Sequence, residues 1–376
     1  MLQVPFLDVR AAYRELQEAI DASVRRIFEN GHYVLGEEIT HFEREFAAYV
    51  GAQHCVGIGS GLDALHLALR AMGIGAGDEV IVPANTYIAT WLAISHAGAT
   101  IVPVDPDERT YNMTPDRVEE AITSKTKAIL PVNLYGQPAP LAHLNKLAEE
   151  KGLLLLQDAS QAHGARSGES PLGAIGTAAA WSFYPTKNLG ALGDAGAVTT
   201  NDKELAERLR CLRNYGATTK YENVERGWNS RLDPVQAAIL RVKLKTLDDW
   251  NERRKNLAEL YLTGLAHTEL RLPQPTLGTT PAWHLFVVRT SKRDALLKHL
   301  GARGIGTGLH YPTPPHLQPA YRDLGFAPGN FPITEALAAE VLSLPMGPHL
   351  LSADAERVVD SVQEYCSMHK AEPVVT

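Results

Sequence analysis

The sequence contains little cysteine, no excess of positive charge and no long apolar run. Its three cysteines, Cys55, Cys211 and Cys366, lie far apart, which excludes a paired-cysteine zinc motif. The formal net charge of −7 argues against a nucleic-acid-binding surface, which needs a basic stripe. No apolar run approaches the ~20 residues that span a bilayer, and the first residues lack the basic and apolar segments of a signal peptide. We therefore expect a soluble, cytoplasmic protein without nucleic-acid or membrane partners.

A metal-binding pattern is also missing. The sequence has 14 histidines, but no helical pair separated by three residues has an acidic ligand nearby. We therefore expect no metal site. The remaining composition, 45% hydrophobic and 21% charged, is typical of a globular enzyme, and 376 residues can form one large domain and a smaller one.

Short apolar strands and helices alternate over the first two thirds of the chain. We expect strands at 54–59, 80–83, 100–104, 128–132, 153–156 and 178–183. Helices are expected between them at 60–70, 85–97, 115–122 and 140–151, and after them at 202–212. Continuous apolar strands between helices indicate a parallel sheet covered on both faces, so the predicted fold class is α/β. Ligands of such sheets bind beyond the carboxyl ends of the strands.

The alternation of short apolar strands with helices stops near residue 250. We therefore expect a large domain at 1–250, with its N-terminal helices, and a smaller C-terminal α+β domain at 251–376. Further helices are expected at 8–29, 40–50, 234–265, 292–302, 334–342 and 353–367, and a strand at 283–288.

Lys187 follows a buried strand in an unusual setting. Pro185 ends the strand, and glycines at 190, 193 and 196 leave little side-chain bulk around the ammonium. Desolvation lowers the pKa of an amine, and a neutral amine can attack a carbonyl to form a Schiff base. Taken alone, the stretch is equally compatible with an ordinary exposed loop lysine.

A glycine-rich turn opens the helix at 60–70. Ser60 is a good N-cap with Asp63 three residues later, and Gly57, Gly59 and Gly61 leave backbone amides open. Free amides at the positive end of a helix dipole bind phosphate. An ordinary capped helix gives the same pattern.

Two further side chains fall just past strand ends. Asp158 closes an all-leucine strand, where a carboxylate is costly unless it meets a cation or several donors. It is either a capping residue or a partner for a protonated ring nitrogen. Tyr87 follows the strand at 80–83. A phosphate site, an aromatic ring, a carboxylate and a reactive lysine are together what pyridoxal phosphate (PLP) requires.

Over nearly its whole length the chain resembles the PLP-dependent sugar aminotransferases of the DegT/DnrJ/EryC1/StrS family. The resemblance implies the aspartate-aminotransferase-like architecture known as fold type I. It rests on the segments 59–65 (GSGLDAL), 77–83 (GDEVIVP), 157–164 (QDASQAHG), 182–190 (SFYPTKNLG) and 229–233 (NSRLD).

The resemblance implies a role for each residue of the cofactor site. Lys187 binds the cofactor covalently and moves the proton, and Asp158 pairs with the pyridinium nitrogen. Tyr87 stacks on one face of the ring, and Gln161 lies near the other. The residues implied to hold the phosphate are Ser182, the amides of Gly61 and Leu62, and Asn229 of a partner subunit, which makes the working unit a homodimer. The family often has threonine where this chain has Leu62, so one hydroxyl contact is missing.

The resemblance also implies a two-step reaction. L-Glutamate converts PLP to pyridoxamine phosphate, which then aminates a nucleotide-linked keto-sugar. The loop at 310–318 is similar to the branch that aminates C3 of dTDP-3-keto-6-deoxyhexoses in the biosynthesis of deoxyamino sugars for antibiotics or polysaccharides. Prolines hold the longer stretch 308–321 extended, so we expect its histidine and tyrosine side chains to be presented rather than packed. Tyr184, His310 and Tyr311 are the expected sugar-binding residues.

Three alternatives remain open. One is amination at C4 of a related nucleotide sugar. Another is a PLP-binding dehydratase, but members of that branch usually replace the lysine with histidine, and Lys187 is present. The third is a regulator, which we expect to carry an added sensing or DNA-binding segment; none is visible.

Overall fold

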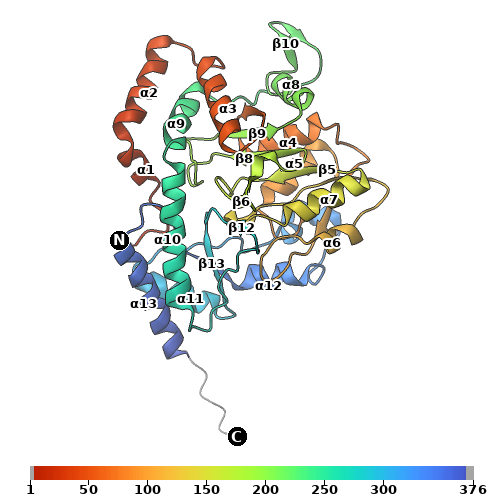
Figure 1. Cartoon of the computed structure of the whole chain (residues 1–376). Coiled ribbons are helices and arrows are strands. Elements are labelled where there is room, and N and C mark those ends of the chain that lie inside the picture. Colours follow the sequence, from red (N-terminus) through yellow and green to blue (C-terminus); the bar gives the residue numbers. More distant parts are fainter. Residues whose placement is uncertain (1–3, 370–376) are drawn as a thin grey trace.

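The computed structural model describes residues 4–369 and is built on a seven-stranded sheet (Figure 1). The strands lie in the order β1 (His54–Ile58), β9 (Gly196–Thr200), β8 (Ala178–Ser182), β5 (Leu154–Asp158), β4 (Thr126–Ile129), β2 (Glu79–Pro83) and β3 (Thr100–Val104). All neighbours from β8 to β3 are parallel, and β9 runs antiparallel to both β8 and β1. The expected α/β fold with a mostly parallel sheet is therefore confirmed.

Helices cover both faces of this sheet because its strands are apolar on both faces. Alternate residues of a strand point to opposite faces, and in β2 Ile81 belongs to one core cluster while Val80 and Val82 belong to the other. One cluster includes residues of α3 (Glu37–Tyr49), α6 (Pro115–Glu120), α7 (Leu141–Lys151) and α9 (Pro234–Leu244). The other includes residues of α4 (Gly61–Ala71), α5 (Ile88–Ala97) and α8 (Lys203–Leu212).

Two of the expected helices are interrupted. The expected helix at 8–29 is two helices, α1 (Val9–Glu15) and α2 (Gln17–Asn30), which meet at Leu16. The expected helix at 234–265 breaks at residues 245–246 into α9 and α10 (Leu247–Leu265). Apolar periodicity continued across both breaks, so it could not reveal them.

The C-terminal part packs around a third core cluster. Its antiparallel strands β13 (Phe286–Arg289) and β14 (Val341–Leu344) pack with α11 (Arg293–Ala302), α13 (Ser352–Met368) and the end of α10. The strand expected at 283–288 starts later, because Trp283 has a left-handed backbone with φ 47°. Val4 bridges Ile305 and joins the same cluster, so the N-terminal segment packs with the C-terminal part. The boundary expected after residue 250 falls inside α10.

Several short elements complete the fold. They are α12 (Pro332–Glu340), the 3₁₀ turns η1 (Leu134–Gly136), η2 (Leu172–Ala174), η3 (Pro315–Leu317) and η4 (Pro319–Leu324), the three-stranded sheet of β12 (Thr279–Thr280), β6 (Arg166–Ser167) and β7 (Ser170–Pro171), and the hairpin of β10 (Ala217–Thr219) and β11 (Glu222–Asn223). The hairpin stands off from the rest of the chain at the top of Figure 1. Between residues 4 and 369, no helix has both the length and the apolar character needed to cross a membrane.

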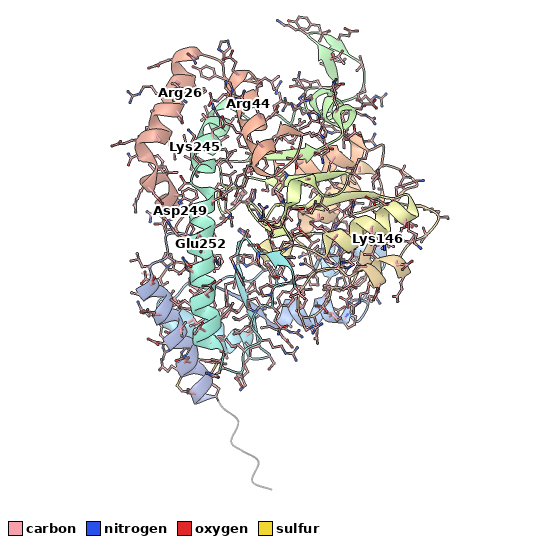
Figure 2. The ribbon with its side chains drawn as sticks, viewed as in Figure 1. Arg26, Arg44, Lys146, Lys245, Asp249 and Glu252 are labelled. Carbon is pink, nitrogen blue, oxygen red and sulfur yellow. The ribbon has the colours of Figure 1, made fainter. Side chains whose placement is uncertain are left out.

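The long helix α10 is exposed on one side and buried on the other. Asp249 and Glu252 lie on its outer face, as Figure 2 shows, whereas Trp250 and Arg254 are buried. Arg254 donates to the carbonyls of Trp283 and His284 at 3.2 and 3.3 Å. Lys243 of α9 is likewise 3% exposed and donates to the Gly190 carbonyl at 2.6 Å. Neither cation forms a salt bridge with any residue that the structure describes, and burial lowers the pKa of Lys243 to about 8.

Lys243→Met should change how stability depends on pH. Above a pH of about 8 the folded chain has released the Lys243 proton, but the unfolded chain holds it until a pH of about 10.5, so the free energy of unfolding of the natural chain rises with pH. Between about pH 7 and pH 10 we expect the free energy of unfolding of the natural chain to rise by about 2 to 3 kcal/mol relative to that of the variant. Urea denaturation at both pH values measures it. Lys245→Met, at the exposed lysine that follows α9 and is labelled in Figure 2, is the matched control and should show no such gain.

Candidate active site

Four segments meet at the carboxyl edge of the sheet. They are the turn from β1 into α4, the segment after β2, the end of β5 and the segment after β8. β1 is parallel to β8 because each is antiparallel to β9, so its carboxyl end reaches the same edge. Side chains that are scattered in the sequence therefore share one site.

The first turn of α4 forms an anion cradle against Ser182. Ser60 caps the helix by accepting a hydrogen bond from the Asp63 amide at 3.1 Å. The amides of Gly61 and Leu62 have no acceptor within the helix and are free for a ligand. A Cβ atom on Gly61 would lie 2.5 Å from the Ser182 Cβ, so only glycine permits this approach. The Leu62 side chain packs against the apolar core, which leaves only its amide for the cradle.

Ser230 holds the turn from behind. Its hydroxyl accepts from the Gly59 amide at 3.1 Å and donates to the Asp63 carboxylate at 2.7 Å. The sequence gives no signal of this contact, because 167 residues separate Ser230 from Asp63 and serine is common in loops.

Asp158 is 6% exposed, and its carboxylate forms no salt bridge with any residue between 4 and 369. One oxygen accepts from the Thr90 hydroxyl at 2.9 Å and the other from the Ser160 amide at 3.1 Å. The Thr86 hydroxyl lies 2.8 Å from the Thr90 hydroxyl and donates to it, because Thr90 donates its single hydroxyl hydrogen to Asp158. Each oxygen retains a lone pair, which suits a ligand N–H. Thr90 gave no signal in the sequence.

Lys187 stands on a tight turn after β8. Its amide donates to the Tyr184 carbonyl at 2.8 Å, and a Cβ atom on Gly190 would lie 2.5 Å from the Pro185 carbonyl oxygen. Burial lowers the pKa of the Lys187 amine to about 8. The Asp158 carboxylate has the opposite, smaller effect, because its negative charge favours the protonated amine. About one amine in ten is therefore neutral at a pH near 7. Asn188 anchors the turn by donating to Asn251 and to the Ala282 carbonyl at 2.9 and 2.7 Å.

Two buried histidines near Lys187 are electrically neutral. Burial, followed by the charge of Lys187, lowers the pKa of His163 to about 3 and that of His284 well below its ordinary value. His284 Nδ1 lies 3.2 Å from the Asn188 side-chain oxygen, which must accept because the Asn188 nitrogen donates elsewhere. The sequence assigns no role to either histidine, although His163 lies in the segment 157–164, because nothing in the local pattern reports their burial beside Lys187.

Three other predicted residues line the same site. The Tyr87 side chain is 53% exposed, and its ring centroid lies 5.2 Å from that of Tyr311 at an interplanar angle of 37°. The Gln161 side chain is buried and donates to the Tyr311 hydroxyl at 3.0 Å. The structure thus brings Tyr311, from the C-terminal part, against two residues expected to flank the cofactor ring.

The proline-rich loop is packed more closely than expected. His310 is half-buried, stacks on Phe6 at 5.7 Å and lies 2.8 Å from the Ser343 hydroxyl. His316 is buried against Phe331, 3.1 Å from the Glu335 carboxylate, and is not presented. The expectation that the stretch 308–321 presents its histidines and tyrosines is therefore wrong for His316, which η3 turns inward, and for Tyr321, which is buried against Trp91.

Tyr184 and Asn229 lie toward solvent. Tyr184 is 52% exposed beside Ser182, whose hydroxyl accepts from the Tyr184 amide at 3.3 Å. Asn229 is exposed and forms a backbone bridge to Asn214. Within residues 4–369 its side chain forms no hydrogen bond with the other site residues.

Comparisons with known proteins agree on one family. The model of the DegT/DnrJ/EryC1/StrS aminotransferase family matches residues 14–363. The chain is 55% identical over 364 residues, 96% of each sequence, to dTDP-3-amino-3,4,6-trideoxy-alpha-D-glucose transaminase of Streptomyces venezuelae. The crystal structure of S. venezuelae DesV in complex with a ketimine intermediate covers 99% of this chain and is itself wholly covered, at 53% identity and a TM-score of 0.97. NtdA from Bacillus subtilis, solved with bound cofactor PMP, is 32% identical to this chain with a TM-score of 0.92. The match covers 98% of this chain and 86% of the NtdA chain.

Gly61→Ala should weaken cofactor binding. The added methyl group pushes Ser182 away from the helix start and removes one donor from the anion cradle. We expect the affinity of the cofactor-free protein for PLP to fall roughly tenfold or more, which corresponds to ~1.4 kcal/mol or more. Absorbance titration measures the change. Gly301→Ala, in open space on α11, is the control, and equal affinities in the two variants would contradict the cradle.

Proposed function

The chain belongs to the DegT/DnrJ/EryC1/StrS aminotransferase family, and we propose that it moves an amino group from L-glutamate to C3 of a dTDP-3-keto-6-deoxyhexose. The observation that carries the proposal is the convergence of a partly neutral Lys187, a buried unpaired Asp158 and the Gly61–Ser182 cradle at one edge of the sheet. The name of the S. venezuelae relative supports the sugar and the carbon that is aminated.

The residues present fit pyridoxal phosphate. The orphaned amides of Gly61 and Leu62, with the Ser182 hydroxyl, supply donors for a phosphate. Asp158 supplies the carboxylate for a ring nitrogen, and Lys187 supplies an amine that loses its proton near neutral pH. Neutral histidines behind Lys187 add no positive charge that would compete for Asp158.

In the reaction this chain's residues position groups and move protons. When bound, the cofactor supplies an electron sink that lets an amino group be exchanged for a keto group. Asp158, held by Thr90 and Ser160, keeps a proton at the ring nitrogen through a charge-assisted hydrogen bond. The Lys187 amine takes up a proton and returns it, because its pKa of about 8 lies near the working pH. Tyr87 covers one face of the site.

The sugar is proposed to bind on the solvent side of Lys187. Tyr184 is exposed there, and His310 and Tyr311 approach from the C-terminal part. Burial, followed by the charge of Lys187, lowers the pKa of His310 to about 4, so its imidazole is neutral at the working pH. These side chains offer hydroxyl and imidazole groups to the hydroxyls and diphosphate of a nucleotide sugar.

The defining experiment is an assay of the PLP-loaded enzyme with L-glutamate and dTDP-keto-sugars. We expect amination of a 3-keto-6-deoxyhexose, with the 4-hydroxy and 4-deoxy forms tested side by side. Lys187→Ala should abolish turnover, and borohydride should attach the cofactor to the peptide that contains Lys187, as mass spectrometry reports. Amination only of a 4-keto-sugar, or labelling of another lysine, would overturn the assignment.

We further propose that two subunits share each site. Asn229 is exposed, lies outside the strand–helix units and forms no side-chain hydrogen bond within the part of the chain that the structure describes. Tyr215, Tyr221 and Val224, on the hairpin of β10 and β11 and its flanks, are exposed apolar side chains of the same irregular segment. Such side chains are typical of a surface that another protein covers. An amide reaching from there toward a partner's anion cradle adds a further phosphate donor.

Mixing two inactive variants tests the shared site. Asn229→Asp places a negative charge beside the phosphate, and Lys187→Ala removes the amine, so each homodimer should be inactive. A heterodimer of the two keeps one intact composite site. After unfolding and refolding an equal mixture, we expect about a quarter of the natural activity, since half of the dimers carry one working site of two. Full activity of a monomer, measured across dilution by light scattering, would contradict this arrangement.

A further inference from the structure

The segment 228–232 lies directly on the turn that forms the anion cradle. Leu232 is buried against β1, where a Cβ atom on Gly57 would lie 2.9 Å from the Leu232 Cβ. Closer to the cradle, a Cβ atom on Gly59 would lie 3.1 Å from the Ser230 hydroxyl oxygen. A methyl group at Gly57 would therefore displace the segment from the turn.

Ser230 is bonded to both ends of the cradle. A backbone N–H can only donate, so the Gly59 amide makes the Ser230 oxygen an acceptor at 3.1 Å. The hydroxyl hydrogen is then donated to Asp63 Oδ2 at 2.7 Å, in the first turn of α4. The free amides of Gly61 and Leu62 belong to the stretch between these two contacts. Ser230 thus holds the part of the backbone that a phosphate would touch.

Consecutive residues of the segment face opposite ways. Trp228 packs edge-on against His66 of α4, with ring centroids 4.8 Å apart, and Ser230 bonds to the start of the same helix. Side chains alternate along an extended chain, so Asn229 between them faces away from α4. Asn229 is exposed, and its backbone bridges Asn214. Ser230 therefore serves the cradle of its own subunit, whereas Asn229 is proposed to reach the cradle of the partner.

Backbone hydrogen bonds join these neighbours into one unit. The amides of Trp228 and Ser230 donate to carbonyls at the C-terminal end of α8, at 2.7 and 3.0 Å. Asn229 lies between these two bonded residues, so a displacement of Ser230 moves Asn229 with it. The side-chain bonds of Ser230 to Gly59 and Asp63 connect this unit with the cradle.

We infer that Ser230 links the two cofactor sites of a dimer, so that a phosphate group bound at one site raises the affinity of the other. A cofactor phosphate on the amides of Gly61 and Leu62 fixes the start of α4 and, through Ser230, the position of Asn229. The second cofactor then meets a cradle whose donor from the other subunit is already in place, and less conformational freedom is lost when it binds. The inference rests on the proposed shared site. It adds that Ser230 is a positioning residue for both sites and that the dimer loads cooperatively.

The expected coupling is modest. Coupling between sites commonly changes affinity about 5- to 150-fold, and the ordering of one side chain belongs at the lower end, about fivefold. With independent sites, about half of the dimers are singly loaded at half saturation, whereas a coupling of about fivefold lowers that share to about a third.

Native mass spectrometry of the full-length dimer counts empty, singly loaded and doubly loaded dimers. The probe is pyridoxamine phosphate, which carries the phosphate but has no aldehyde to bond with Lys187, added to the cofactor-free protein. We expect about a third of the natural dimers to be singly loaded at half saturation. Ser230→Ala removes both side-chain bonds, so its singly loaded share should rise to about half.

Two further variants complete the experiment. Asn229→Ala removes the donor offered to the partner, so it should also give a share of about half, and combining it with Ser230→Ala should change the share no further. Ser361→Ala is the matched control: this buried serine of α13 donates to the Arg357 carbonyl at 2.8 Å, and its variant should keep the natural share. Calorimetry of the same proteins measures the affinities in solution.

The outcomes separate the inference from the proposals on which it rests. If the natural chain binds no pyridoxamine phosphate, the proposed function fails, and if it is a monomer, the shared site fails. If natural dimers bind the probe but about half are singly loaded, the inference is overturned. It is also overturned if Ser230→Ala binds more weakly yet keeps the natural share, since Ser230 would then support only its own cradle. Should Ser230→Ala fail to form dimers, Ser230→Cys, which keeps the size of the side chain but hydrogen-bonds weakly, must raise the share above the natural value.

Discussion

The enclosure of a half-buried Lys187 and a buried Asp158 at the carboxyl edge of the sheet is the constraint on which the rest of the site depends. A carboxylate and an amine removed from water each lose solvation, and among the residues that the structure describes neither forms a salt bridge. Thr90 and Ser160 compensate Asp158 only in part, and Lys187 responds by a lowered pKa. The two groups are therefore stabilised further by a ligand that brings a protonated nitrogen and a carbonyl carbon, which explains why such an arrangement suits PLP chemistry.

The fold supports this edge from both parts of the chain. Asn188, beside the lysine, bonds to α10 and to the Ala282 carbonyl, and the left-handed turn at Tyr135 and Gly136 packs on His284 and Gln161. Arg254 donates to the carbonyls of Trp283 and His284 from inside α10. The C-terminal part thus contributes to the site through backbone contacts at 282–284 as well as through His310 and Tyr311. A change in how the two parts pack would move Tyr311 relative to Asp158.

Agreement between sequence and structure is best where local rules govern. The apolar strands, the Ser60 cap and the end of α5 at Gly98 lie where the residues predict them, because alternation, capping and left-handed glycine are short-range effects. The family and the fold class inferred from the motifs are confirmed by the family match and by the DesV structure. Helix breaks at Leu16 and at residues 245–246 were missed, since the apolar stripe continues through them.

The sequence by itself determined the fold class, the family and the residues expected to hold the cofactor, because strand periodicity, glycine turns and the lysine motif are local patterns. Only the tertiary structure decided which groups surround them. Thr90 reaches Asp158 across 68 residues, Ser230 reaches Asp63 across 167, and Gln161 reaches Tyr311 across 150. No local pattern marks such contacts, since the energy of a hydrogen bond depends on distance and direction in space rather than on separation along the chain. The same reason explains why His316 is buried although its proline-rich loop suggested exposure.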